Sequence, residues 1–195
     1  MNLLFLLCTV FVCACSSIPK FKDMDAENLL FPKGEYKHKA VVKLREKEGE
    51  ENARPLNVNG ILTLDDKELN LLGISAFGTA VFRYAENLET GEVSSQIFDS
   101  KLKKEEKSIN TYFQALRRAL ILPGDGALKG YTEVLSSDGS GRPAIIKVLG
   151  SPTFRADYSS YGNDGIPEKV KLKGDFFEIR IEFSERPTVD IDAPN

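Results

Sequence analysis

The chain has 195 residues, and its 29 acidic and 26 basic side chains give a formal net charge of −3 at pH 7. This balance has no basic excess, so nucleic acid is not expected as a partner. With 42% hydrophobic residues and 12 phenylalanines, the chain can bury the core of one domain of the usual size, about 100 to 200 residues.

An apolar run from Leu3 to Val12 begins the chain, and Ala14 and Cys15 follow it closely. A transmembrane helix needs roughly 20 apolar residues, whereas the core of a signal peptide takes about 7 to 15. The run therefore predicts a signal peptide over residues 1–14, although no Lys or Arg precedes it. An ordinary secretory signal cut after Ala14 and an uncleaved membrane-anchoring helix are the alternatives.

The sequence Val12-Cys13-Ala14-Cys15 resembles the lipobox of bacterial lipoproteins. In that family the cysteine after the small residue receives the lipid, which implies acylation of Cys15. No cysteine lies beyond position 15, so the mature chain can form no internal disulfide and has no thiolate metal site. By the sorting rule of that family, Ser16 is compatible with transfer to the outer membrane. The resemblance thus implies a lipid-anchored domain that faces the periplasm.

Residues 15–35 form the predicted tether, whose apolar patch at 29–31 either docks on the domain or approaches the membrane. Strand-like segments joined by short turns follow at 36–44, 57–64, 69–75, 77–84 and 92–98. The glycines Gly73 and Gly78 inside this pattern predict bulges or bends, where a sheet curls. His38, the single histidine, is expected on the solvent side of the first strand.

Residues 104–122 predict one amphipathic helix, which Pro123 and the glycines after it end. Its apolar stripe consists of Ile109, Tyr112, Phe113, Leu116, Ala119 and Leu120. The polar residues expected on the other faces are Lys103, Lys107, Gln114, Arg117 and Arg118. The stripe either packs on the sheet or binds a membrane surface.

The second half of the chain predicts further strands at 131–135, 142–150, 153–159, 166–173 and 176–183. The last two strands alternate strictly between apolar and polar residues, which is typical of an antiparallel sheet with one wet face. The clusters at 136–141 and 161–165 lack the ligand spacing of a calcium-binding hand, so turns are expected there. The predicted fold is α+β: a curled antiparallel sheet, an unclosed β-barrel, with one main helix across its concave side.

These features together resemble the LolA/LolB group, and its lipidated LolB side with its uncharacterised relatives most of all. The resemblance rests on the lipobox, the antiparallel strands, the helix at 104–122 and the closing segment 166–181, and it covers residues 36–185. It implies an unclosed barrel with a lipid-binding cavity that serves lipoprotein localisation. The chain departs from it in having no tryptophan. The exposed apolar loop of LolB has only a weak candidate counterpart at Ala127-Leu128.

The expected function is that of a lipid-anchored binding protein which holds acyl chains or a lipoprotein cargo in an apolar cavity. The candidate lining residues, each also explained by core packing, are Leu62, Leu64, Phe82, Ile146, Val148, Phe177, Ile179 and Ile181. The alternative is a structural or interaction lipoprotein with a filled core and no ligand.

No motif of a known reaction, metal site or nucleotide site occurs in the sequence. We therefore expect no enzymatic activity, no metal and no cofactor, and a monomer whose membrane contact is made by its lipid. The residues 186–195 form a tail without periodicity.

Overall fold

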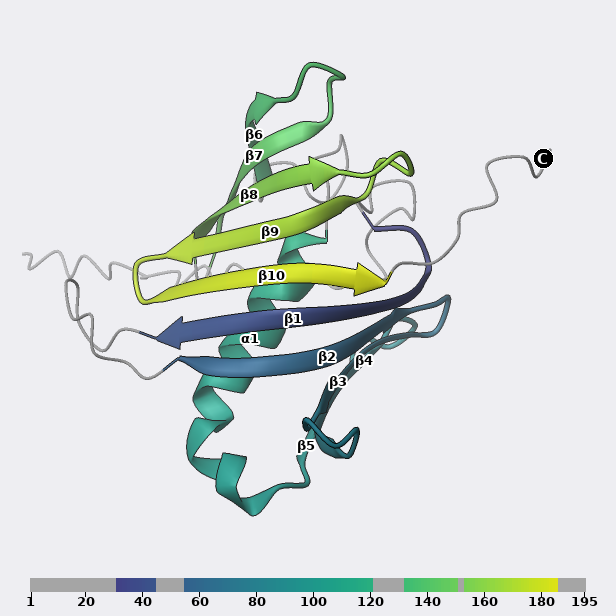
Figure 1. Ribbon diagram of the computed structural model, residues 1–195, viewed down its shortest axis with the longest axis vertical. Helices are drawn as coiled ribbons and strands as arrows, with labels where there is room; N and C mark the ends of the chain where they lie inside the picture. The colour runs from purple at the N-terminus through teal and green to yellow at the C-terminus, as the bar shows by residue number, and fades with distance from the viewer. Residues whose placement is uncertain (1–30, 45–54, 121–131, 151–152, 186–195) are drawn as a thin grey trace, which may run out of the picture.

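The computed structural model describes residues 31–44, 55–120, 132–150 and 153–185 (Figure 1). Within these ranges ten strands form a single sheet with the order β5-β4-β3-β2-β1-β10-β9-β8-β7-β6. The strands are β1 (Gly34–Leu44), β2 (Leu56–Leu64), β3 (Glu68–Ile74), β4 (Ala80–Asn87), β5 (Val93–Ile97), β6 (Thr132–Ser137), β7 (Pro143–Val148), β8 (Phe154–Tyr161), β9 (Pro167–Gly174) and β10 (Phe177–Glu185). A 3₁₀ helix, η3 (Ser100–Glu105), leads into the α-helix α1 (Glu106–Ala119).

All neighbouring strands pair antiparallel, and the sheet does not close, because β5 and β6 stand at its two ends. Its centre is the pair of β1 with β10, where Val42 lies opposite Ile179. Figure 1 shows α1 running across the strands on one side of the sheet. The predicted unclosed antiparallel sheet with one main helix is therefore confirmed at this level.

Period-two alternation decides which side chains point towards α1. In β1, Tyr36, Ala40 and Val42 are buried, whereas Lys39 and Lys43, which have the opposite parity, are exposed. The same alternation in β10 buries four apolar residues on one face. A sheet with one apolar and one wet face must cover the apolar one, and α1 does so with its own apolar stripe.

The position of β4 differs from the prediction of a strand at 77–84. Phe77 lies in the turn before β4, with 95% of its surface exposed. The hydroxyl of Ser75 accepts hydrogen bonds from the backbone N–H groups of Phe77 and Thr79, both at 3.2 Å. Gly78 adopts a φ of +80° there, which glycine reaches without strain. This turn, rather than the hydrophobicity of Phe77, sets the start of the strand.

The bulge expected at Gly73 is present, because the register of β3 with β4 shifts between Gly73 and Ile74. A Cβ on Gly73 would lie only 2.2 Å from the ring of Phe82. Glycine is therefore required at this position by the close approach of the ring.

The predicted helix also begins differently. A carboxylate oxygen of Asp99 accepts a hydrogen bond from the backbone N–H of Lys101 and caps η3, so the first residues of the predicted 104–122 helix are 3₁₀. The helical residues of α1 end at Ala119, and 121–131 lie outside the described residues.

The predicted tether, 15–35, is too long at its carboxyl end. Phe31 is buried, and its ring centroid lies 5.5 Å from that of Tyr36 and 5.0 Å from that of Phe183. For this residue the docking alternative is confirmed. Residues 1–30, including the leader, Cys15 and the rest of the patch, and the tail 186–195 lie outside the described residues.

Candidate functional site

The structure brings the eight predicted lining residues together on the inner face of the sheet. They are Leu62 and Leu64 from β2, Phe82 from β4, Ile146 and Val148 from β7, and Phe177, Ile179 and Ile181 from β10. All eight are buried and belong to one continuous apolar cluster that also includes the stripe of α1. Their position suits the wall of an apolar cavity and a packed core alike.

The stripe of α1 packs on the sheet, which decides against a membrane surface as its partner. Its six apolar residues are all buried in the same cluster. The ring of Phe113, for example, lies 5.2 Å from that of Tyr84 on β4. The space in front of the central strands is thus shared between side chains of the sheet and of the helix.

His38 was expected on the surface and is instead buried, with only 2% of its surface exposed. Its Nε2 shares a hydrogen bond with the hydroxyl of Tyr112 on α1, while Nδ1 has no partner of normal geometry among the described residues. The ring of Phe183 lies 5.6 Å away. A Cβ on Gly60 would lie 2.7 Å from the imidazole, so glycine makes room for it.

Burial sets the protonation of this pair. The pKa of His38 falls to about 4, because the apolar surroundings disfavour the imidazolium, and the backbone of Tyr36 offsets only part of the effect. The pKa of Tyr112 is raised by burial. At neutral pH both groups are uncharged, and they form a polar link between β1 and α1 inside an apolar interior.

Arg117 was expected on an outer face of the helix and is also buried. Its Nη2 donates a 2.9 Å hydrogen bond to the carboxylate of Glu86, and its Nε donates to the other carboxylate oxygen. The side chains are 6% and 1% exposed, respectively. Glu86 shares its inward parity on β4 with Phe82 and Tyr84, so strand alternation is the signal that finds it. This ion pair ties α1 to β4.

Arg118, likewise expected outside, is buried next to it. Its guanidinium donates to the carbonyl of Leu149 and lies 5.1 Å from the ring centroid of Phe154. Burial lowers the pKa of Arg118 to about 10, and the neighbouring Arg117 adds to this effect. On the same turn of α1, the carbonyl of Ala119 accepts a 2.6 Å hydrogen bond from the hydroxyl of Tyr158. The carboxyl end of α1 is therefore held by polar contacts as well as by packing.

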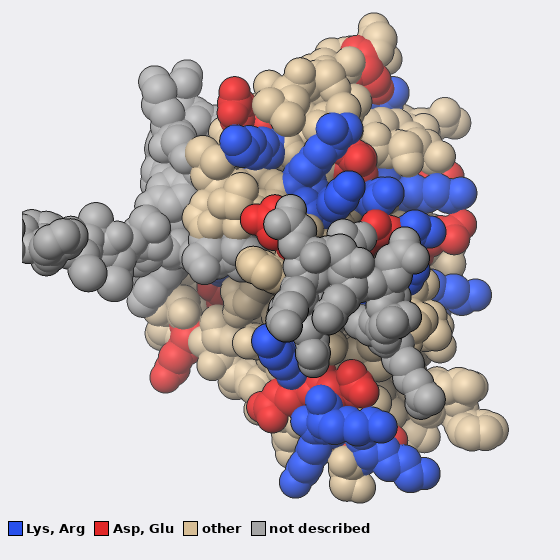
Figure 2. Space-filling view, turned by 90° about the vertical axis from the view of Figure 1, so that its left-hand side faces the viewer, with Lys and Arg blue, Asp and Glu red and all other residues tan. Residues whose placement is uncertain are grey.

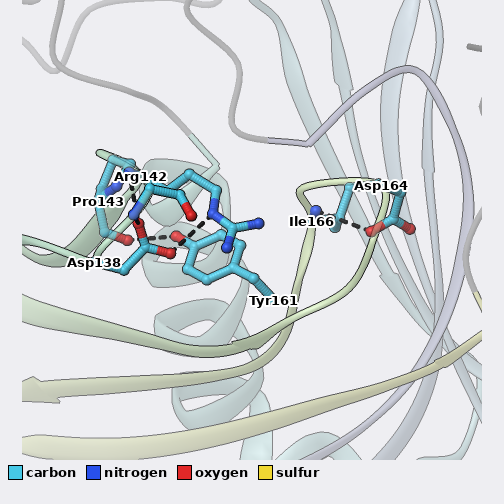
Figure 3. Close-up of polar contacts among 7 residues, drawn as sticks. Asp138, Arg142, Pro143, Tyr161, Asp164 and Ile166 are labelled. Atoms are coloured by element: carbon cyan, nitrogen blue, oxygen red, sulfur yellow. Dashed lines mark hydrogen bonds and ion pairs between the residues drawn. The ribbon is translucent and has the colours of Figure 1, made fainter.

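The turns predicted at 136–141 and 161–165 are present, but Ser136 and Ser137 belong to β6 and Tyr161 belongs to β8. Figure 3 shows the hydrogen bonds of the carboxylates in these turns. Asp138 accepts 2.9 Å hydrogen bonds from the backbone N–H groups of Ser140 and Arg142 and from the guanidinium of Arg142. Asp164 accepts from the N–H of Ile166 at 3.0 Å. Both carboxylates stabilise their own turns. Within the described ranges no group of three His, Cys, Asp or Glu side chains could hold a metal ion.

Three exposed phenylalanines follow the carboxyl ends of β3, β5 and β9, or lie in the turns there. In this antiparallel sheet these three strand ends point in the same direction. Phe77 lies between β3 and β4, Phe98 after β5, and Phe176 between β9 and β10, with exposed fractions of 95%, 47% and 60%. The sequence predicts strands at 77–84, 92–98 and 176–183, and this prediction does not reveal the exposure of the three rings. The weak loop candidate, Ala127-Leu128, lies outside the described residues.

Comparison with known proteins adds no assignment, since no protein-family model and no curated protein matches the chain. In the part of the chain that the structure describes, no helix combines the length and hydrophobicity needed to cross a membrane. The features that bear on function are therefore the inner face of the sheet, the buried polar contacts of α1 and the exposed phenylalanines.

Proposed function

We propose that this protein is a lipid-anchored binding protein of the bacterial outer membrane, of LolB-like type, that holds an acyl chain or a lipidated cargo between its sheet and α1. The observation that carries the proposal is the unclosed, ten-stranded antiparallel sheet whose apolar inner face is covered by a single described helix. Such an arrangement offers a long apolar surface with few polar groups, which is what an acyl chain requires. Cys15 carries the anchor in this proposal, and no side chain has a catalytic role.

The Phe77 turn supports the same proposal. The phenylalanine at the tip of this turn is 95% exposed, so its ring is free to contact a membrane or an apolar partner. The LolA/LolB resemblance implies an exposed apolar loop, and this turn is a better candidate for it than Ala127-Leu128.

The second candidate is an interaction lipoprotein with a filled core. Close packing favours it: the eight lining candidates and the stripe of α1 form one buried cluster. In this case the surface, rather than the interior, would carry the function.

A cavity-filling substitution separates the two candidates. Ala40 on β1 is buried on the inner face, whereas Val41 beside it points to the outer face. If the interior holds cargo, Ala40→Leu lowers the affinity for a fluorescent acyl probe and leaves the free energy of unfolding nearly unchanged. In a filled core the same change costs about 1–3 kcal/mol, because overpacking strains the neighbours. Val41→Leu is the matched control and should change neither quantity.

Native mass spectrometry of the gently purified, lipidated protein gives the direct test. A bound lipid beyond the covalent anchor supports the binding protein. Absence of such a mass, together with no probe binding by the wild-type chain, refutes the cavity and leaves the interaction lipoprotein.

A further inference from the structure

Exposed aromatic and basic side chains occur in the turn before β4, directly after β5 and in η3. We define a basic-aromatic patch by Phe77, Phe98, Lys101, Lys103 and Lys104, all of which are exposed. Figure 2 shows Lys and Arg side chains gathered at the lower end of the molecule, where Figure 1 places the start of α1. The patch therefore occupies one end of the molecule.

Backbone contacts bring the two aromatic residues of the patch near each other. The N–H of Phe98 donates to the carbonyl of Val81 on β4 at 2.9 Å, and η3 begins two residues later. Phe77 precedes Val81 by four residues, which is at most about 13 Å along an extended chain. The backbone at Phe77 therefore lies close to Phe98 and to the start of η3, which carries the lysines of the patch.

The exposed charge of the patch is positive although acidic residues occur nearby. Asp99 is half-buried and caps η3, and Glu105 is half-buried, with its carboxylate 3.5 Å from the hydroxyl of Ser108. Of the acidic residues between 99 and 107, only Glu106 is exposed, whereas the three lysines of the patch and Lys107 are all exposed.

We propose that this patch docks on the anionic headgroup surface of a phospholipid bilayer. Phe77 and Phe98 enter the boundary between headgroups and acyl chains, as the phenylalanines of membrane-surface segments do, and the lysines bind anionic headgroups. A protruding ring on a turn and flexible lysines do not form the close-packed apolar centre that a protein interface needs. A bilayer interface requires no such fixed shape, so lipid is the occupant that these side chains fit.

The position of the predicted anchor is compatible with this docking. Phe31, the first described residue, lies just before the start of β1, and the antiparallel pairing places this start at the opposite strand ends from Phe77 and Phe98. The chain between Cys15 and Phe31 can span at most about 55 Å, and the 11 residues of β1 cover about 36 Å. The anchor and the patch can therefore reach the same bilayer. This inference rests on the proposed membrane location but not on a cargo-binding cavity.

The absence of tryptophan from the sequence makes a direct test possible. In the lipidated Phe77→Trp protein, the new indole is the only one and reports on its own surroundings. On vesicles that contain phosphatidylglycerol we expect a blue-shifted emission and strong quenching by brominated lipids. On vesicles of phosphatidylcholine alone the quenching should be much weaker.

Changing Lys101, Lys103 and Lys104 together to Gln tests the electrostatic part. Each lysine near an anionic surface should favour the docked state about fivefold, so the triple change shifts docking on the order of 100-fold. The matched control changes three exposed lysines of the outer face of the sheet, at positions 39, 147 and 169.

The control should leave the quenching within about twofold of that of Phe77→Trp alone. The proposal would be overturned by an equal loss of quenching in both triple variants, by equal quenching on both vesicle types, or by no quenching at all. Binding of an acyl probe in the lysine variants reports separately on the cavity, so a failure of one proposal is distinguishable from a failure of the other. The unlipidated Cys15→Ala chain, with and without Phe77→Trp, should sediment equally with vesicles that contain phosphatidylglycerol, which checks that the reporter itself does not create the binding.

Discussion

Acidification should weaken the attachment of α1 to the sheet through His38. The imidazole is buried against apolar neighbours and shares its Nε2 hydrogen bond with Tyr112. Protonation would place an unpaired charge in this interior, which is strongly unfavourable. The histidine therefore stays neutral in the folded chain over a wider pH range than in the unfolded chain.

The size of the effect follows from the shift in pKa. The pKa of His38 is about 4 in the folded chain, compared with its ordinary value of 6.5. Between these values the unfolded chain binds the proton and the folded chain does not, so stability falls as the pH falls. One pKa unit corresponds to about 1.4 kcal/mol. The stability present above pH 6.5 thus decreases by about 3 kcal/mol as the pH approaches 4.

Urea unfolding at a series of pH values between neutral and about pH 4 measures this loss. The comparison is with the double variant His38→Leu/Tyr112→Phe, which removes both polar groups and leaves no buried hydroxyl unpaired. The carboxyls of Asp65, Asp138 and Glu178, whose pKa values are lowered, also reduce stability in acid, but they do so equally in both proteins. Parallel pH profiles for wild type and double variant would show that His38 is not buried and neutral, and the reasoning would fail.

Three further changes test the packing, the ion pair and the anchor. Gly73→Ala should lower the free energy of unfolding by about 1–3 kcal/mol, because its methyl group would meet an aromatic ring at 2.2 Å, whereas Gly139→Ala, with open space around it, should have little effect. Glu86→Gln should cost about 3 kcal/mol or more in the same unfolding assay, since it leaves the buried guanidinium of Arg117 without its charge partner, and a loss below about 1 kcal/mol would contradict the buried pair. Cys15→Ala should abolish acylation as measured by mass spectrometry, and membrane partition equal to that of wild type would refute the anchor.

The alternation of side chains along a strand predicts which residues are buried better than the polarity of those residues does. His38 has the same parity in β1 as the buried Tyr36 and Ala40, so its inward direction could be read from the sequence. The polarity of His38 predicted a position on the surface. This prediction was wrong, because a neutral imidazole with a hydroxyl partner can be buried. The same holds for Glu86 on β4. Its partner Arg117 could not be found in this way, since only the folded sheet brings the two together.

The pairing of strands that are far apart in the chain could not be predicted from the sequence either. Consecutive strands were expected to pair with their neighbours in the chain, and most of them do. The central pair joins β1 to β10, however, and the apolar patterns of these strands fit many partners equally well. The hydrophobicity of Phe77 predicts a strand, but Ser75 and Gly78 on either side of it form a turn and leave the ring exposed.

The polar contacts of α1 limit how cargo can enter the interior. Tyr112, Arg117 and Ala119 contact β1, β4 and β8, and β4 and β8 lie on opposite sides of the central strands. In an unclosed sheet the pairing of strands does not fix the distance between the two halves, so a helix bound to both halves contributes to fixing it. An acyl chain must therefore lie beside these contacts or release α1 from one half. Hydrogen exchange of α1 with and without an acyl probe distinguishes the two routes, because protection of its amides rises in the first and falls in the second.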